Sequence, residues 1–258
     1  MSIAYSVDQV LAAGAEIAEY FERTFIGAKY SSNELLRTRA CLCLSVGEGY
    51  RALIALLSSR GQSYAPVVLR AMFEAVADLK ILCEDSEHLK QMQFDNAKQY
   101  LRTFREFRDD EAAAIDAAGK QMLDAAVAIE QAIHDQLRSV ERTRFSIRDK
   151  FERAGMRDLY RSVYAYLCSF SHNNINTLRQ RHGASGNLSF ADPLSPRTAL
   201  QLLGVGSAGY ANALLLAPHF STLTDSEAST ANTWMWRRLE QLDSTEISSV
   251  KPQRPTIP

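Results

Sequence analysis

No stretch of this 258-residue sequence alternates apolar and polar residues with the period of two that marks a half-buried β-strand. No internal repeat at solenoid spacing occurs either. Apolar residues recur at helical spacing instead, in segments bounded by capping residues, glycine and proline. The sequence therefore predicts an all-α fold, a multi-helix bundle of about eight or nine helices.

The short motifs of common catalytic sites are also missing. There is no glycine-rich phosphate loop, no His-x-x-x-His pair, no Gly-x-Ser-x-Gly and no Cys-x-x-Cys. Cys41 and Cys43 are two residues apart, which places them on opposite sides of a helix and prevents them from binding one metal ion together. We expect structural thiols, no metal and no cofactor.

A strong net charge is absent, because 29 basic residues nearly cancel 30 acidic ones. Nothing in the overall charge predicts a polyanionic partner. Residues 137–181 are an exception, with ten basic and four acidic side chains and a local charge of +6. This segment either holds phosphate groups or forms a solvated helix face laced with salt bridges.

Asp8 and Glu16 interrupt the first residues, so we expect no secretory signal there and a cytoplasmic protein. The 21 uncharged residues between Arg197 and His219 are long enough to cross a membrane. Polar residues and glycines dilute their hydrophobicity, so we predict a core or interface helix and no membrane insertion. Its small residues would let another helix approach closely, for example from a second subunit: Gly204, Ala208 and Gly209.

Capping residues and helix breakers divide the chain into segments. Ser6 with Gln9 and Ser31 with Glu34 form capping boxes, and Ser195 with Pro196 starts a later helix. The first three predicted helices end near Ala28, Arg60 and Glu84. Further helices are predicted over these ranges: 87–108, 110–142, 147–154, 158–178 and 225–242. We expect one domain over residues 1–243, with a core over 31–178, C-terminal helices over 196–242 and a flexible tail over 244–258.

The segment from Pro66 to Cys83 is apolar around most of its circumference, yet it carries Arg70 and Glu74. These two residues share one strip of the helix. Such a helix should be central in the fold, and charges removed from water must be paired there. Arg70 and Glu74 either brace the core as an internal ion pair or furnish a site.

A second polar position lies in the helix expected over residues 158–178. His172 shares a strip with Arg161 and Ser169, away from the wide apolar face of that helix. Small neighbouring side chains leave room for a ligand or a water beside the imidazole. His172 is therefore a candidate for proton transfer, with a satisfied structural histidine as the alternative.

The helix with Arg70-x-x-x-Glu74, followed by a tyrosine-rich helix that ends in Ser169-x-x-His172, resembles a bacterial all-helical family catalogued as domain of unknown function 5677. The resemblance covers residues 35–176. That family is similar in turn to the HEPN group, many of whose members are metal-independent ribonucleases of toxin and antiphage systems and are commonly dimeric. The resemblance implies a HEPN-like core with additional C-terminal helices.

It also implies roles for single residues. His172 would move a proton at the ribose 2′-hydroxyl while an arginine steadies the phosphate, so the catalytic candidates are His172, Arg70 and Glu74. The binding candidates are Ser169, Arg161, Tyr164 and Arg144. The expected partners are RNA or another protein, together with a second copy in a homodimer.

The sequence departs from the HEPN pattern at one position that matters for catalysis. The nuclease motif has an arginine four to six residues before the histidine, where this chain has Tyr166, Leu167 and Cys168. Three functions stay open: a HEPN-like RNA-binding or RNA-cleaving protein of defence systems, a non-catalytic interaction, immunity or regulatory protein, and an enzyme that acts on a small molecule beside Glu74.

Overall fold

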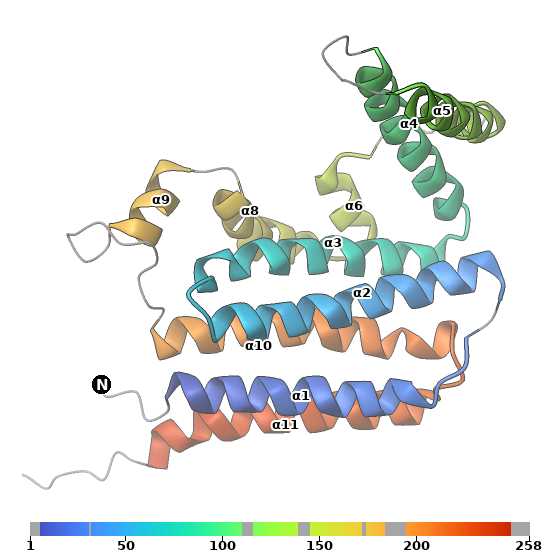
Figure 1. Cartoon of the computed structure of the whole chain (residues 1–258). Helices are drawn as coiled ribbons and strands as arrows, with labels where there is room; N and C mark the ends of the chain where they lie inside the picture. Colours follow the sequence, from blue (N-terminus) through green and yellow to red (C-terminus); the bar gives the residue numbers. More distant parts are fainter. Residues whose placement is uncertain are drawn as a thin grey trace, which may run out of the picture. The chain divides into compact units, whose positions relative to one another are not determined.

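The computed structural model describes residues 6–30, 32–109, 116–138, 145–171, 174–183 and 195–248. In these ranges every regular element is a helix, and the one β-contact is an isolated bridge between Tyr30 and Ser221 (Figure 1). The predicted all-α multi-helix bundle is confirmed for this part of the chain.

Contacts divide the chain into two compact units. Unit 1 comprises Met1–Cys83 and Lys150–Pro258, and unit 2 comprises Glu84–Asp149. Unit 2 holds the helices α4 (His88–Arg108) and α5 (Ala117–Leu137). The other helices lie wholly or mainly in unit 1: α1 (Val7–Ile26), α2 (Glu34–Leu57), α3 (Ala65–Glu84), α6 (Ile147–Arg153), α7 (Arg157–Leu159), α8 (Ala165–Ser171), α9 (Ile175–His182), α10 (Pro196–Leu215) and α11 (Asp225–Ser248).

Stacked aromatic rings from three helices form the centre of unit 1. Tyr210 of α10 lies between Phe21 of α1 and Tyr50 of α2, with ring centroids 3.6 and 4.8 Å apart. The buried Tyr50 hydroxyl shares a hydrogen bond of 2.9 Å with the Ser207 hydroxyl, so its polar atom is satisfied inside the core. Burial raises the pKa of Tyr50, which keeps this hydroxyl protonated.

The glycines of α10 allow this close packing. A Cβ added at Gly206 would lie 2.5 Å from Leu53 of α2, and one added at Gly209 would lie 3.3 Å from Phe73 of α3. The neighbours that approach this small-residue face are therefore helices of the same unit, whereas a Cβ at Gly204 would meet nothing within 4 Å.

Two helices are long and apolar enough to pass a length-and-composition test for a membrane span: Glu34–Leu57, with a mean hydropathy of 1.5, and Pro196–His219, with 1.3. Core helices of soluble proteins pass the same test. The share of the tested window that is buried inside the protein is 33% in the first helix and 56% in the second.

Several predicted helix boundaries are confirmed and others shift. Ser6 with Gln9 and Ser195 with Pro196 cap α1 and α10 as expected. The N-cap of α2 is Asn33, whose side chain accepts from the Leu36 N–H, while Ser31 lies outside the described residues. Helix α11 continues to Ser248, six residues past its predicted end and into the segment predicted as a flexible tail.

The single helix predicted over residues 158–178 is wrong. The chain forms the short helix α7, then a π-helical turn over Tyr160–Tyr164, then α8, and Asn174 caps the separate helix α9. The Asn174 side chain accepts from the Asn176 N–H, and such local bonds compete with helix continuation. The π-turn also shifts the register, so a uniform helical wheel does not apply across this segment.

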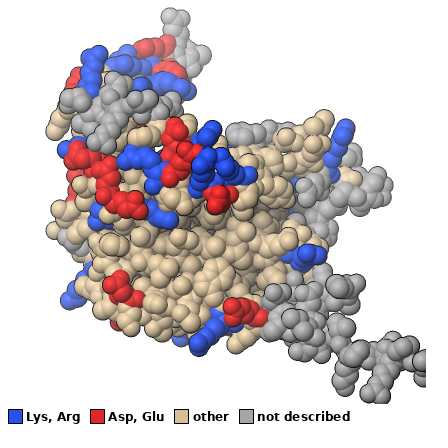
Figure 2. All heavy atoms as spheres, turned by 180° about the vertical axis from the view of Figure 1, so that it is seen from behind, with Lys and Arg blue, Asp and Glu red and all other residues tan. Residues whose placement is uncertain are grey.

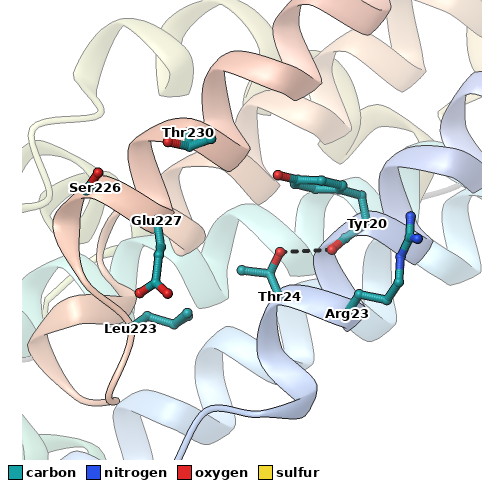
Figure 3. A pocket seen from close by; sticks show the side chains of 7 residues that line it. All are labelled: Tyr20, Arg23, Thr24, Leu223, Ser226, Glu227 and Thr230. Atoms are coloured by element: carbon teal, nitrogen blue, oxygen red, sulfur yellow. Dashed lines mark hydrogen bonds between the residues drawn. The ribbon is translucent and has the colours of Figure 1, made fainter.

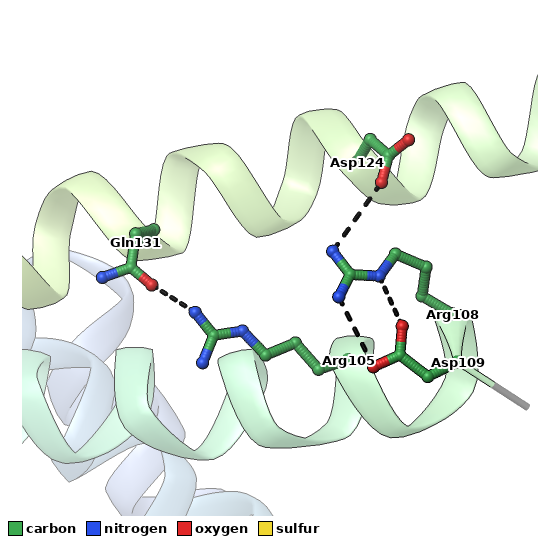
Figure 4. A network of polar contacts seen from close by, with 5 residues as sticks. All are labelled: Arg105, Arg108, Asp109, Asp124 and Gln131. Atoms are coloured by element: carbon green, nitrogen blue, oxygen red, sulfur yellow. Dashed lines mark hydrogen bonds and ion pairs between the residues drawn. The ribbon is translucent and has the colours of Figure 1, made fainter.

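Unit 2 is an antiparallel helix hairpin. Arg105 of α4 donates to Gln131 of α5, and Arg108 lies 4.0 Å from Asp124, so later residues of α4 meet earlier residues of α5 (Figure 4). Phe94 of α4 stacks on His134 of α5 with ring centroids 4.9 Å apart, which fits the same antiparallel arrangement. The two helices therefore form a hairpin over the described parts of both.

Candidate functional site

Helix α3 presents one polar strip, on which charged residues recur every four positions: Arg70, Glu74 and Asp78. Eleven of its 20 residues are buried, so the helix packs as predicted. The side chains of Arg70 and Glu74 nevertheless keep 28% and 34% of their surface exposed. The two charges thus lie at the edge of the packed face and not inside it, because the strip they occupy reaches solvent.

Arg70 and Glu74 form a closed set of hydrogen bonds with Tyr164. The Arg70 Nε–H donates to Glu74 Oε1 at 3.0 Å and to the Tyr164 hydroxyl oxygen at 3.2 Å. The Tyr164 hydroxyl in turn donates to Glu74 Oε1 at 2.6 Å. Burial and the Glu74 carboxylate raise the pKa of Tyr164, so its hydroxyl stays a donor. We call these three residues the Tyr164 triad.

The π-turn positions Tyr164. In this turn the Ala165 N–H donates to the Tyr160 carbonyl, five residues back. The Tyr164 ring packs on Phe151 at 4.6 Å and on Tyr160 at 5.5 Å, and it is buried. Turns of this kind often occur at functional positions, where they turn one side chain toward a new neighbour. Here that neighbour is the polar strip of α3.

A second ion pair extends the strip and was not predicted. Lys150 Nζ of α6 lies 2.9 Å from both carboxylate oxygens of the buried Asp78. The sequence signal existed, since Asp78 follows Glu74 by four residues on the same strip. The strip therefore contacts α6 through Asp78 and the π-turn through Arg70 and Glu74.

The remaining predicted site residues do not join the triad in the described structure. The Ser169 hydroxyl donates to the Tyr166 carbonyl at 2.7 Å and accepts from Thr177 at 3.1 Å. Arg161 is exposed on the π-turn. His172 and Arg144 lie outside the described residues.

Surface hollows lie elsewhere in unit 1. One, of about 370 Å³, opens between α1 and the start of α11. In Figure 3, Glu227 projects into the space between these helices while Arg23 points away from it. No residue predicted for the site lines this hollow. The described residues contain no group of three or more metal-binding side chains.

Charged side chains on the face seen in Figure 2 are intermingled: lysines and arginines gather next to aspartates and glutamates. Within the segment predicted to be basic, Lys150 pairs with Asp78 and Arg157 lies 3.4 Å from Glu152. The exposed pair of Arg157 with Glu152 fits the solvated, salt-bridged alternative for that segment, whereas the pair with the buried Asp78 is part of the packing of α3.

Fold and site together define an all-helical protein with a polar strip braced against a tyrosine on a π-turn. The sequence matches the profile of a family of unknown function (DUF5677) over residues 40–188, more than half of the chain, so the chain belongs to this family. The matched residues include all three members of the Tyr164 triad. No curated protein and no solved structure matches the chain.

Proposed function

We propose that the chain is a non-catalytic helical interaction protein that pairs with a second copy through the outer face of α5. The observation that carries this proposal is that none of the 21 residues of α5 is buried. Most helices of globular proteins bury an apolar face, and their stability depends on that contact.

The uncovered face of α5 is an uncharged stripe with heptad spacing: Ala118, Met122, Ala125, Ile129 and Ala132. Met122 is 75% exposed and Ile129 is 60% exposed. The α5 residues that contact α4, among them Asp124 and Gln131, lie on the opposite side of the helix. The stripe is therefore turned away from the hairpin seam.

The pattern of the stripe selects its occupant. Consider two α5 helices that pack antiparallel through this stripe, about a two-fold axis at the height of Val127 along the helix. Met122 then faces Ala132, and Ala125 faces Ile129. Each layer then joins a large side chain to a small one, as close packing requires. A parallel pair would instead place Met122 on Met122 and Ala125 on Ala125. Beside the seam, Gln121 would face Asp135, so no like charges meet.

The Tyr164 triad supports the non-catalytic part of the proposal. Its three polar groups satisfy one another, and with Asp78 and Lys150 they connect three elements of unit 1. A carboxylate bonded to a guanidinium and a phenol within the same network is a stable ground-state arrangement. We therefore assign Arg70 and Glu74 to the bracing of α3.

Sedimentation velocity of the purified chain tests the pairing. We expect a dimer at micromolar concentration that Ile129→Lys converts to a monomer, because a lysine in the centre of the seam has no partner. Leu44→Lys is the matched control, since Leu44 is an exposed leucine of α2 in unit 1. A wild-type monomer, or equal behaviour of the two variants, refutes the proposal.

Disulfide trapping tests the orientation. In a background with the exposed Cys41 changed to Ser, Ala128→Cys should form a covalent dimer, because Ala128 faces its own copy beside the axis. Met122→Cys, which faces Ala132 in the antiparallel pair, should not. Cross-linking of Met122→Cys alone would point to a parallel pair, in which Met122 faces Met122.

A second candidate function is RNA binding or cleavage on a HEPN-like fold with His172, Arg70 and Glu74. It is favoured by the partial exposure of Arg70 and Glu74, which leaves the edge of the triad open to a ligand. It predicts that the purified chain cleaves or binds single-stranded RNA and that His172→Ala removes this activity without changing the unfolding temperature. Equal RNA binding and cleavage by the wild type and by His172→Ala rejects this candidate.

A further inference from the structure

Arg181 of α9 is a buried charge with little to neutralise it. Arg181 is 7% exposed, and its Nε is buried without a hydrogen-bond partner in the described structure. Within the described part of the chain it lies over a ring: the guanidinium carbon is 4.3 Å from the centre of Tyr64. Among the described residues, no carboxylate forms an ion pair with it.

Such an arrangement is unfavourable without a counter-ion. An unpaired buried ion costs several kcal/mol, whereas a cation–π contact returns about 0.5 to 2 kcal/mol. Tyr64 ends the 3-10 turn Gln62–Tyr64 and directly precedes Ala65, the first residue of α3. The ring that Arg181 covers therefore belongs to the residue just before the positive end of the dipole of that 20-residue helix.

We propose that the Arg181 guanidinium, held over Tyr64 at the start of α3, binds a phosphate-type oxyanion. Its planar N–H fork matches two oxygens of a tetrahedral anion, and helix N-termini favour the same ligand class. Tyr64 is 53% exposed, so the guanidinium over its ring lies near the surface, where an ion can reach it. This site lies within the family match and is independent of the pairing of α5.

Direct binding to the wild-type chain tests the site without any substitution. Inorganic phosphate is titrated at constant ionic strength, with chloride as the balancing anion, while calorimetry and the arginine Nε–H signals in ¹⁵N-edited NMR are followed. We expect saturable binding of one phosphate and a shift of a single Nε–H signal, which Arg181→Lys assigns by its loss. A titration with AMP asks whether a phosphoryl group on a larger molecule also binds.

Binding of phosphate alone identifies the free ion as ligand, and binding of AMP as well identifies the phosphoryl group. Absence of saturation by both overturns the proposal. So does a phosphate response that chloride reproduces at equal ionic strength.

A neutral variant supplies the second test. In chloride buffer, Arg181→Met should unfold at the same temperature as the wild type or higher, because it removes an uncompensated charge. Phosphate should raise the unfolding temperature of the wild type and leave that of Arg181→Met unchanged, with binding at least tenfold weaker. Arg179→Met, at an exposed position of the same helix, should keep the phosphate response. Should Arg181→Met fail to fold in both buffers, Arg181 is a structural cation and the proposal is wrong.

Discussion

Helices α3 and α5 have nearly the same length and lie in the same family match, yet they are stabilised in different ways. Helix α3 buries eleven residues, while α5 buries none. The apolar residues of α3 are mostly leucine, valine, methionine and phenylalanine, whereas half of those of α5 are alanine. An alanine removes little apolar surface from water, so α5 gains little from packing within the monomer. The difference shows that α3 is a core helix, whereas α5 has no buried residue.

The largest expected effect is a difference between these two helices in sensitivity to truncation. Leu69→Ala removes a fully buried side chain of α3 and should lower the free energy of unfolding by about 2 to 5 kcal/mol. Ile129→Ala on α5 should change it by less than about 0.5 kcal/mol in the monomer. Urea unfolding at nanomolar concentration measures both. Similar losses for the two variants would remove the contrast.

A smaller effect should come from the tyrosine that fixes the polar strip of α3. Tyr164→Phe deletes the hydroxyl that bonds to Glu74 and Arg70, and we expect a loss of about 1 to 2 kcal/mol. Tyr166→Phe is the control, because Tyr166 is exposed on α8 and should be neutral. Thermal unfolding of the two variants decides the matter, and a neutral Tyr164→Phe would mean that the triad contributes nothing to stability.

The turn that ends α6 offers a backbone test in the unit that holds α3. Gly155 has a φ of 65°, a left-handed conformation that costs an alanine about 1 kcal/mol. Gly155→Ala should destabilise by that amount, whereas Gly27→Ala should be neutral or slightly stabilising. Gly27 ends α1 with a φ of −91°, and an added Cβ there meets nothing within 4 Å. Chemical denaturation of both variants provides the comparison, and an unchanged Gly155→Ala would refute the assigned conformation.

The smallest effect is expected at a surface ion pair of unit 1. The hydrogen bond from Arg238 of α11 lowers the pKa of Glu16 of α1 below its usual 4.5. A lowered carboxyl pKa contributes stability above pH 4.5, and this contribution disappears as the pH falls through the folded-state value. Because Glu16 is half exposed, the gain is at most about 1 kcal/mol. Unfolding measured between pH 7 and pH 3 should show a smaller decrease for Glu16→Gln than for the wild type.

The sequence was sufficient for the elements whose signals are local. Helical periodicity predicted the all-α class, and Ser6 and Ser195 cap helices as their neighbours indicate. Arg70 and Glu74 were correctly placed on one face of α3 because four residues make about one turn. The family named from these motifs is confirmed by the match over residues 40–188.

Features that depend on contacts between segments were not predictable in this way. Neither the π-turn over Tyr160–Tyr164 nor the cap at Asn174 has a distinctive composition, so the sequence predicts one uniform helix over residues 158–178. The bond between Asp78 and Lys150 requires knowing that α6 reaches α3, which no periodicity reveals. The partial exposure of Arg70 depends in the same way on how far neighbouring elements cover the strip.

The wide turn at Tyr160–Tyr164 also makes this segment unusually sensitive to insertion or deletion. Removing one residue there would restore uniform α-helical bonding and rotate all that follows by about 100°. Tyr164 would then leave Glu74, and the side chains of α8 would turn by the same angle. Family members that differ in length by one residue at this point should therefore lack the tyrosine brace, even when every residue of α3 is identical.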